Sequence, residues 1–208
     1  MPALLLQIHP DNPQIAKIRA AVEIIKKGGL VIYPTDTVYA IGCDIYNQKA
    51  VEKVCRLKDI QPGKINLSFI CKDLSHISEY TKSLPTNIFK LMKHVLPGPY
   101  TFILNASSNV PNILNTKKKT IGIRVPDHKI IQLLIEELGN PILSTSIKND
   151  DAILEYTTDP EEIYDRYKNL VDVIIDGGFG GNEASTILDC TGNEVEVVRV
   201  GKGSVEEL

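Results

Sequence analysis

Apolar residues at helical spacing alternate along this chain with short, continuous apolar runs. One helix face is marked by apolar residues three or four positions apart, Ile15, Ile18, Val22 and Ile25. Gly28 and Gly29 follow, and glycine readily adopts the left-handed conformation that ends a helix. Similar spacing predicts further helices over residues 48–58, 86–96, 128–138 and 159–169. In the last of these, Asp159 is expected at the N-cap and Pro160 at the first helical position.

The short apolar runs predict strands between these helices, over residues 30–33, 65–71, 100–104, 120–125, 141–145, 171–175, 185–189 and 195–200. Because helices and strands interleave, the sequence predicts an α/β fold around one central sheet. The connection between Asp189 and Val195 is too short for a crossover helix, so that strand pair is expected to be antiparallel and the sheet mixed. No repeat or interior linker divides the chain, which predicts a single domain over residues 1–208.

Composition and charge exclude several classes of protein. The net charge of −3 and the pI near 5.8 give no signature of a general nucleic-acid binder, although Lys117, Lys118 and Lys119 form a local basic run. The cysteines form no CxxC pair and the histidines no HExxH pattern, so no metal site is expected. The sequence shows no signal peptide and no apolar run of the roughly 20 residues that span a bilayer. A soluble, cytoplasmic protein without a membrane partner is therefore expected.

The most distinctive polar segment directly follows the apolar run 30–33. Pro34 ends that strand, and Thr35, Asp36 and Thr37 then place oxygen-bearing side chains in succession, with Tyr39 two residues later. In α/β proteins, the backbone leaving the end of a strand is a common place for small polar ligands. Pro, Thr and Asp are also ordinary turn residues, so a ligand site and a simple turn both remain open.

Two arginines inside apolar strands need a partner. Arg124 precedes Pro126 at the end of one predicted strand, and Arg199 lies in another. Such a guanidinium must reach an acidic side chain, an anionic ligand or solvent, and the sequence leaves a structural salt bridge and ligand binding open. Hydroxyls stand at further strand ends, in Ser144-Thr145-Ser146 and Ser185-Thr186.

Two loops also carry alternative interpretations. The glycine-rich segment 177–181 is either a flexible turn, which we slightly favour, or a place where a ligand approaches the backbone closely. The polar segment 147–158 is predicted to be a long surface loop, either an active-site lid or merely a mobile connection.

Seven segments, in this order, resemble the YrdC family, the threonylcarbamoyl-AMP synthases of tRNA modification. They are residues 34–39, 96–101, 121–126, 144–146, 175–178, 185–189 and 198–201. The resemblance runs from about residue 14 to the end and implies an open, twisted mixed sheet with a concave, positively charged cavity, flanked by helices. It also implies a reaction that joins L-threonine, bicarbonate and ATP, with Mg²⁺ on the phosphates, into threonylcarbamoyl-AMP and pyrophosphate. Possible macromolecular partners implied by the family are tRNA and double-stranded RNA.

The resemblance also implies roles for individual residues. Catalytic roles fall to Lys58, Arg124 and Ser146. Substrate-binding roles fall to Thr35, Thr37, Tyr39, Thr101, Ser144 and Ser185. Nucleotide-binding roles fall to Lys58, Lys148 and Arg199. Within this set, Arg124 is expected to bind the threonine carboxylate, and Lys58 the phosphates.

Two departures from the synthase pattern leave a second function open. Ile60 stands where the family carries an arginine, and Asn66 where it carries a proline. Lys148 stands where the family carries an asparagine. Both changes resemble the YciO branch of the family. The sequence therefore predicts a threonylcarbamoyl-AMP synthase-like nucleotidyltransferase, with a nucleotide- or double-stranded-RNA-binding protein of reduced or lost synthase activity as the alternative.

Overall fold

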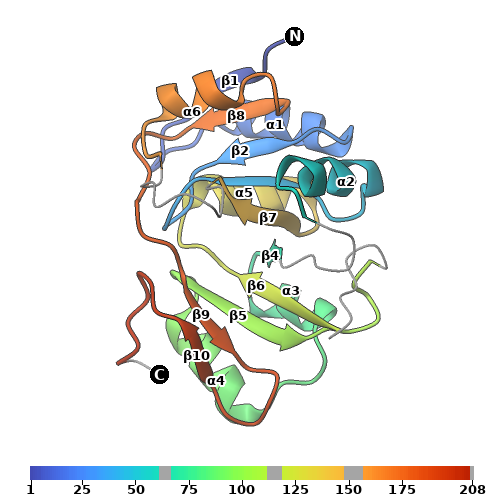
Figure 1. The fold of residues 1–208 in the computed structure, drawn as a ribbon, viewed down its shortest axis with the longest axis vertical. Coiled ribbons are helices and arrows are strands. Elements are labelled where there is room, and N and C mark those ends of the chain that lie inside the picture. Colours follow the sequence, from blue (N-terminus) through green and yellow to red (C-terminus); the bar gives the residue numbers. More distant parts are fainter. Residues whose placement is uncertain (61–66, 112–118, 148–156, 207–208) are drawn as a thin grey trace.

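A computed structural model describes residues 1–60, 67–111, 119–147 and 157–206. Within these residues, ten strands form one sheet in the order β1-β8-β2-β3-β7-β4-β6-β5-β9-β10 (Figure 1). The strands are β1 (Leu4–Gln7), β2 (Val31–Tyr33), β3 (Ala40–Asp44), β4 (Ser68–Ile70), β5 (Tyr100–Asn105), β6 (Thr120–Arg124), β7 (Ile142–Ser146), β8 (Val173–Asp176), β9 (Thr186–Asp189) and β10 (Glu196–Arg199). The helices are α1 (Ile15–Lys26), α2 (Gln48–Leu57), α3 (Leu74–Tyr80), α4 (Thr86–Val95), α5 (Lys129–Leu138) and α6 (Pro160–Tyr167).

The predicted α/β class and the mixed sheet are confirmed. Parallel pairs join β1 to β8, β2 to β8, β4 to β6 and β5 to β9. The other neighbouring pairs are antiparallel, including the predicted pair of β9 and β10. The predicted helix ends are confirmed where glycine or a cap was expected. Gly28 and Gly139 both have φ +86°, and Asp159 accepts a hydrogen bond from Glu161 N at 2.8 Å.

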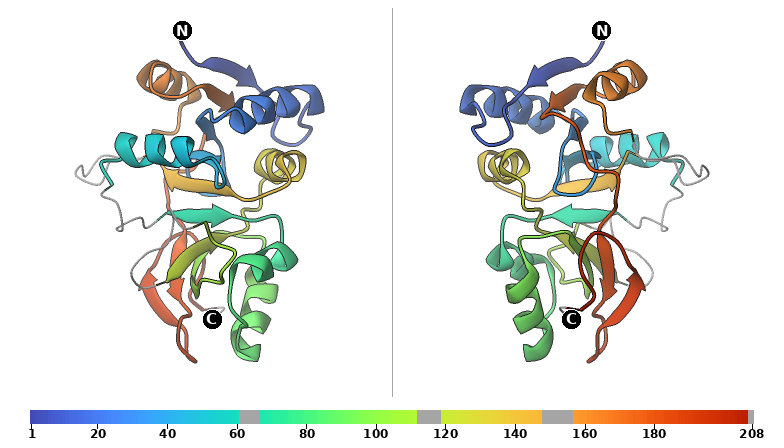
Figure 2. Two further views of the ribbon diagram at one scale, coloured as in Figure 1. Left: turned by 90° about the vertical axis from the view of Figure 1, so that its right-hand side faces the viewer. Right: turned by 90° about the vertical axis from the view of Figure 1, so that its left-hand side faces the viewer.

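Two apolar clusters hold the helices against the sheet. One joins α1 and α5 to β2 and β8, and these helices lie side by side on the same side of the molecule (Figure 2). The larger cluster takes in buried residues from α2, α3, α4 and α6 together with the strands from β3 to β9. Burying the apolar stripe of each helix in this way supplies most of the driving force for a fold of this kind. Among the described residues, no helix is long and apolar enough to cross a bilayer.

Three elements were not predicted from the sequence: β1, β3 and α3. The strand β3 begins at Ala40, directly after the segment for which a ligand site and a simple turn were both left open. Of the predicted strand 65–71, the structure shows β4 over Ser68–Ile70, while residues 65 and 66 lie outside the described residues. Most of the predicted loop 147–158 and two lysines of the run 117–119 also lie outside them.

Candidate active site

A cavity of about 150 Å³ lies on the sheet and collects side chains from strands that are far apart in the sequence. Its lining comes from β3, β4, β5, β6, β7, β9 and β10 and from the segments that enter β3 and β9. The lining residues are Val38, Ala40, Ser68, Thr101, Arg124, Ser144, Thr145, Ser146, Ala184, Ser185, Ile187 and Arg199. Two guanidinium groups and several hydroxyls therefore share one hollow, a combination suited to an anionic ligand.

Arg124 is the buried cation of this cavity. It ends β6, is 8% exposed, and donates from Nη2 to Asp36 Oδ1 and to Thr37 Oγ1, both at 2.9 Å. Asp36 Oδ2 accepts a further hydrogen bond from Asp127 N at 3.1 Å. Burial lowers the pKa of Arg124, and the carboxylate of Asp36 opposes that shift. The Nε of Arg124 is buried without a partner among the described residues. Buried donors are rarely left unpaired, so this atom has a hydrogen-bonding demand that no described residue meets.

The hydrogen-bonded pair Thr35 and Thr37 orients the side chain of Arg124. Thr35 Oγ1 donates to Val38 O at 2.7 Å and accepts from Thr37 N at 3.1 Å. The two hydroxyl oxygens lie 3.0 Å apart. Since the single hydrogen of Thr35 goes to Val38 O, Thr37 is the donor in the contact between the hydroxyls and the acceptor for Arg124. Both hydroxyl hydrogens are thus used within the protein, and what the threonines provide is the placement of Arg124.

Ser185, which leads into β9, contacts residues of both neighbouring strands, Arg199 on β10 and Thr101 on β5. Arg199 donates from Nε and Nη2 to Ser185 O at 3.2 and 2.8 Å. The hydroxyl oxygens of Ser185 and Thr101 lie 2.8 Å apart. A register shift between Val197 and Arg199 marks a bulge in β10, and such bulges re-aim side chains at sheet edges.

The glycine-rich segment packs against the segment 34–39. Tyr39 donates to Gly178 O at 2.7 Å and accepts from Gly177 N at 3.1 Å. A Cβ on Gly180 would lie 2.6 Å from Tyr39 Cδ2, and one on Gly181 would collide with Thr37 O. Burial raises the pKa of Tyr39 to about 12, so its phenol stays a donor at neutral pH. The sequence favoured a flexible turn here, with the close approach of a ligand as the alternative. In the structure the close approach is made by the segment that holds Arg124.

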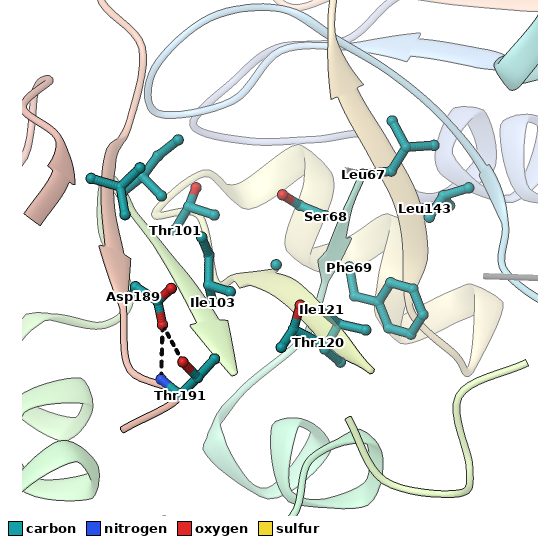
Figure 3. Close-up of a pocket in the computed structure, with 13 residues that line it drawn as sticks. Leu67, Ser68, Phe69, Thr101, Ile103, Thr120, Ile121, Leu143, Asp189 and Thr191 are labelled. Carbon is teal, nitrogen blue, oxygen red and sulfur yellow. Dashed lines mark hydrogen bonds between the residues drawn. The ribbon is translucent and has the colours of Figure 1, made fainter. Parts of the chain in front are cut away.

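A second, larger cavity of about 510 Å³ adjoins the first and shares Ser68, Thr101 and Ile187 with it (Figure 3). Asp189 and Thr191 lie at one side of it, while Leu67, Phe69 and Leu143 lie at the other. Asp189 Oδ1 accepts from Thr191 N and Oγ1 at 2.9 and 2.7 Å. The combined space is within the usual range for a small-molecule site.

The structure brings together most, but not all, of the residues that the sequence singled out. Six of them line the smaller cavity: Thr101, Arg124, Ser144, Ser146, Ser185 and Arg199. Thr35, Thr37 and Tyr39 do not line it. Thr37 contacts Arg124 and Thr35, and Tyr39 contacts Gly178. Lys58 is the C-cap of α2 and is not among the lining residues, and Lys148 lies outside the described residues. The roles assigned to these residues stay predictions.

Sequence reasoning missed three residues of this site. Asp36 was noted within its segment but was not paired with Arg124. Ser68 lines both cavities, and nothing in its local sequence marked it. Tyr33 donates a hydrogen bond to Ser144 across β3, although its position at the end of a buried strand indicated only a core residue.

Comparison with known proteins decides the family. Residues 23–201 match the model of the Sua5/YciO/YrdC family, described as telomere recombination. The chain belongs to the Sua5/YciO/YrdC family. It is 48% identical over 202 residues to the uncharacterized protein YciO of Escherichia coli K12, covering 96% of each chain. The crystal structure of E. coli YciO superposes with a TM-score of 0.92, covering 99% of this chain and 98% of that one.

More distant family members carry a named activity or ligand. A threonylcarbamoyl-AMP synthase of Vibrio vulnificus is 30% identical over 168 residues, covering 80% of this chain and 89% of that protein. The structure of P. abyssi Sua5 complexed with L-threonine superposes with a TM-score of 0.88 at 28% identity. That match covers 99% of this chain and 59% of the longer Sua5 chain. The resemblance inferred from the seven segments, including its YciO-like departures, is thereby confirmed at the level of the family.

Proposed function

We propose that this protein is a threonylcarbamoyl-AMP synthase-like nucleotidyltransferase that joins L-threonine, bicarbonate and ATP for tRNA modification. The observation that supports this most is the meeting of Arg124, Arg199 and the serine hydroxyls at one cavity. All three substrates carry negative charge, so a site that joins them needs cations and neutral donors in one place. The structure of P. abyssi Sua5 complexed with L-threonine supports the choice of amino acid.

In this proposal, the threonine carboxylate binds beside Arg124. Asp36 and Thr37 occupy Nη2, which fixes the plane of the guanidinium and leaves its Nε without a protein acceptor among the described residues. A carboxylate beside the part of Arg124 that lines the cavity would make charge-assisted hydrogen bonds, which are the strong ones. Ser144 and Ser146 supply further donors on the same side of the cavity.

The nucleotide phosphates lie toward Arg199 in this proposal. The amine of threonine first attacks the carbon of bicarbonate and water leaves, which gives N-carboxy-threonine. Its new carboxylate then attacks the α-phosphorus of ATP, the bond from that phosphorus to the bridging oxygen breaks, and pyrophosphate leaves. Arg199 and Lys58 would offset the charge that develops on the phosphates. Mg²⁺ would enter with ATP, since this ion at nucleotide sites is held largely by the phosphates. Holding a short-lived carbamate beside the α-phosphate is chiefly a matter of positioning.

The test is release of pyrophosphate from ATP. The proposal predicts release that requires both L-threonine and bicarbonate, and that Arg124→Ala abolishes. A native protein that releases no more pyrophosphate than the Arg124→Ala variant would refute the synthase activity. Because that variant leaves Asp36 unpaired, circular dichroism must first show that it is folded.

A second candidate function is nucleotide or double-stranded RNA binding without the synthase step. It is favoured by Ile60, which packs against the larger apolar cluster and offers no charge where the family has an arginine. Duplex RNA binding measured at several salt concentrations tests this, because each phosphate contact makes affinity fall as salt rises. Absence of binding at low salt would remove this candidate.

A further inference from the structure

Ser144 in the cavity is hydrogen-bonded to the fully buried phenol of Tyr33, which has no part in the proposed reaction. The hydroxyl of Tyr33, a residue that is 0% exposed, donates to Ser144 Oγ at 2.6 Å. Ser144 itself is 4% exposed and lines the cavity beside Arg124. A short hydrogen bond therefore joins a buried phenol to a serine that lines the cavity.

The register of three neighbouring strands makes this contact possible. Tyr33 lies on β2 and Ser144 on β7, with β3 between them, and the β3 residue paired with Ser144 is Gly42. A Cβ on Gly42 would lie 3.0 Å from Tyr33 Cε1. The missing side chain therefore leaves room for the Tyr33 ring to pass over β3 and reach Ser144.

We propose that Tyr33 is a positioning residue that commits the hydroxyl of Ser144 to donate its hydrogen bond to the anionic ligand in the cavity. This inference rests on the proposed function for the identity of that ligand. A serine hydroxyl has one hydrogen and two lone pairs, and the phenol hydrogen occupies one lone pair. The hydrogen of Ser144 is then left for another acceptor, and the cavity is where a ligand oxygen would supply one.

The environment of Tyr33 keeps it a donor. Burial raises the pKa of the phenol well above its ordinary value, so the proton stays in place at any physiological pH. Without the phenol, the Ser144 hydroxyl would be free to rotate, and binding would have to select the orientation in which its hydrogen meets the ligand. An oxygen anion gains only from the hydrogen, so losing the phenol should weaken binding without changing the shape of the cavity.

Calorimetric titration with L-threonine tests the proposal with four proteins: native, Tyr33→Phe, Ser144→Ala and the double variant. Tyr80→Phe is the matched control, because it removes another buried phenol whose oxygen lies 2.8 Å from that of Tyr46, away from the cavity. Tyr33→Phe is expected to weaken binding about two- to threefold, the cost of selecting one of the staggered orientations that the freed hydroxyl can take. The double variant should bind no more weakly than Ser144→Ala, and Tyr80→Phe should bind as the native protein does. General loosening of the fold would not produce this lack of additivity.

Two results would overturn the role of Tyr33: native affinity in Tyr33→Phe, or losses in the two single variants that multiply in the double variant. If the native protein does not bind L-threonine at all, the proposed function fails, and the same proteins are titrated with inorganic phosphate. Weaker phosphate binding by Tyr33→Phe, again without additivity, would then uphold the positioning role. Equal phosphate binding by native and Tyr33→Phe proteins, or no binding by any of them, would overturn it.

Discussion

Arg124 and Asp36 form an ion pair with 2.9 Å between Nη2 and Oδ1, and both side chains are only 10% exposed. The pair joins β6 to the segment after β2, across 88 residues of sequence. The structural salt bridge that the sequence left open for Arg124 is therefore present, and ligand binding by this residue stays a prediction. Asp36 holds Nη2, and Nε faces no acceptor among the described residues.

Replacing Asp36 with Ala should destabilise the protein by about 3–5 kcal/mol, because it leaves the charge of Arg124 buried and unpaired. Urea unfolding measures the change. Lys72→Ala is the control, since Lys72 and Glu136 form an exposed pair of the kind worth about 0–1 kcal/mol. Equal effects of the two substitutions would mean that the Arg124 pair is solvated and does not organise the site.

Gly181→Ala should destabilise the protein by about 1–3 kcal/mol, because a Cβ there would collide with Thr37 O and push two packed segments apart. The substitution should also weaken ligand binding, since Thr37 accepts from Arg124. Gly192→Ala is the matched control, because a Cβ at Gly192 meets nothing within 4 Å. If both variants unfold at the same urea concentration, the close packing of the glycine-rich segment is not a constraint.

The stability of the protein should fall as pH drops below about 6.5, in part because of His128. Burial lowers the pKa of His128, opposed by Asp36, Asp127 and Asp11, and its Nδ1 has no partner among the described residues. The unfolded chain then takes up this proton at a higher pH than the folded protein, so the free energy of unfolding falls with pH across that window.

His128→Gln provides the comparison for this effect. Urea unfolding at about pH 7.5 and at about pH 5.5 should show a smaller loss of stability in the variant than in the native protein. The contribution of His76, whose pKa burial also lowers, is the same in both proteins and cancels. An identical loss in both would exclude His128 as a source of acid sensitivity.

Ile60→Arg should restore the cation that the synthase pattern carries at this position. A charge-assisted contact is worth about 1.5–3 kcal/mol, so ATP affinity or the rate of pyrophosphate release should rise about 10- to 100-fold. Ile60→Met is the control, because it keeps an apolar side chain against the larger cluster. No gain in Ile60→Arg, in a variant that remains folded, would show that this position does not reach the nucleotide.

Much of the fold was predictable because local signals and packing agree. In α5, five buried apolar residues follow helical spacing and Gly139 ends the helix in the left-handed conformation. In α6, Asp159 and Pro160 mark the start as expected. The sequence of such a segment predicts its secondary structure without knowledge of what the segment packs against.

The missed elements lack these signals. β3 has the sequence AIGCD, which includes a glycine and does not alternate, because Ala40 to Cys43 are all buried. β1 is four residues long and lies at the sheet edge, where it pairs only with β8. In α3 only Ile77 and Tyr80 are buried, so the apolar stripe is too short to predict a helix from its spacing.

Part of the site could be predicted from the sequence as individual residues, but the contacts between them could not. Hydroxyls at strand ends indicated Ser144 and Ser185, and apolar surroundings indicated that Arg124 needs a partner. Which partner it has depends on long-range pairing that local sequence does not encode. The bond from Tyr33 to Ser144 spans 111 residues and crosses an intervening strand, which is why it emerged only from the structure.

The central claim is that the cavity beside Arg124 binds the carboxylate of L-threonine. Calorimetric titration of the native protein with L-threonine and with L-threoninamide, which lacks the carboxylate, tests it most directly. We expect saturable binding of one L-threonine per chain and at least tenfold weaker binding of the amide. Equal binding of the two compounds, or no binding of L-threonine, would contradict the account.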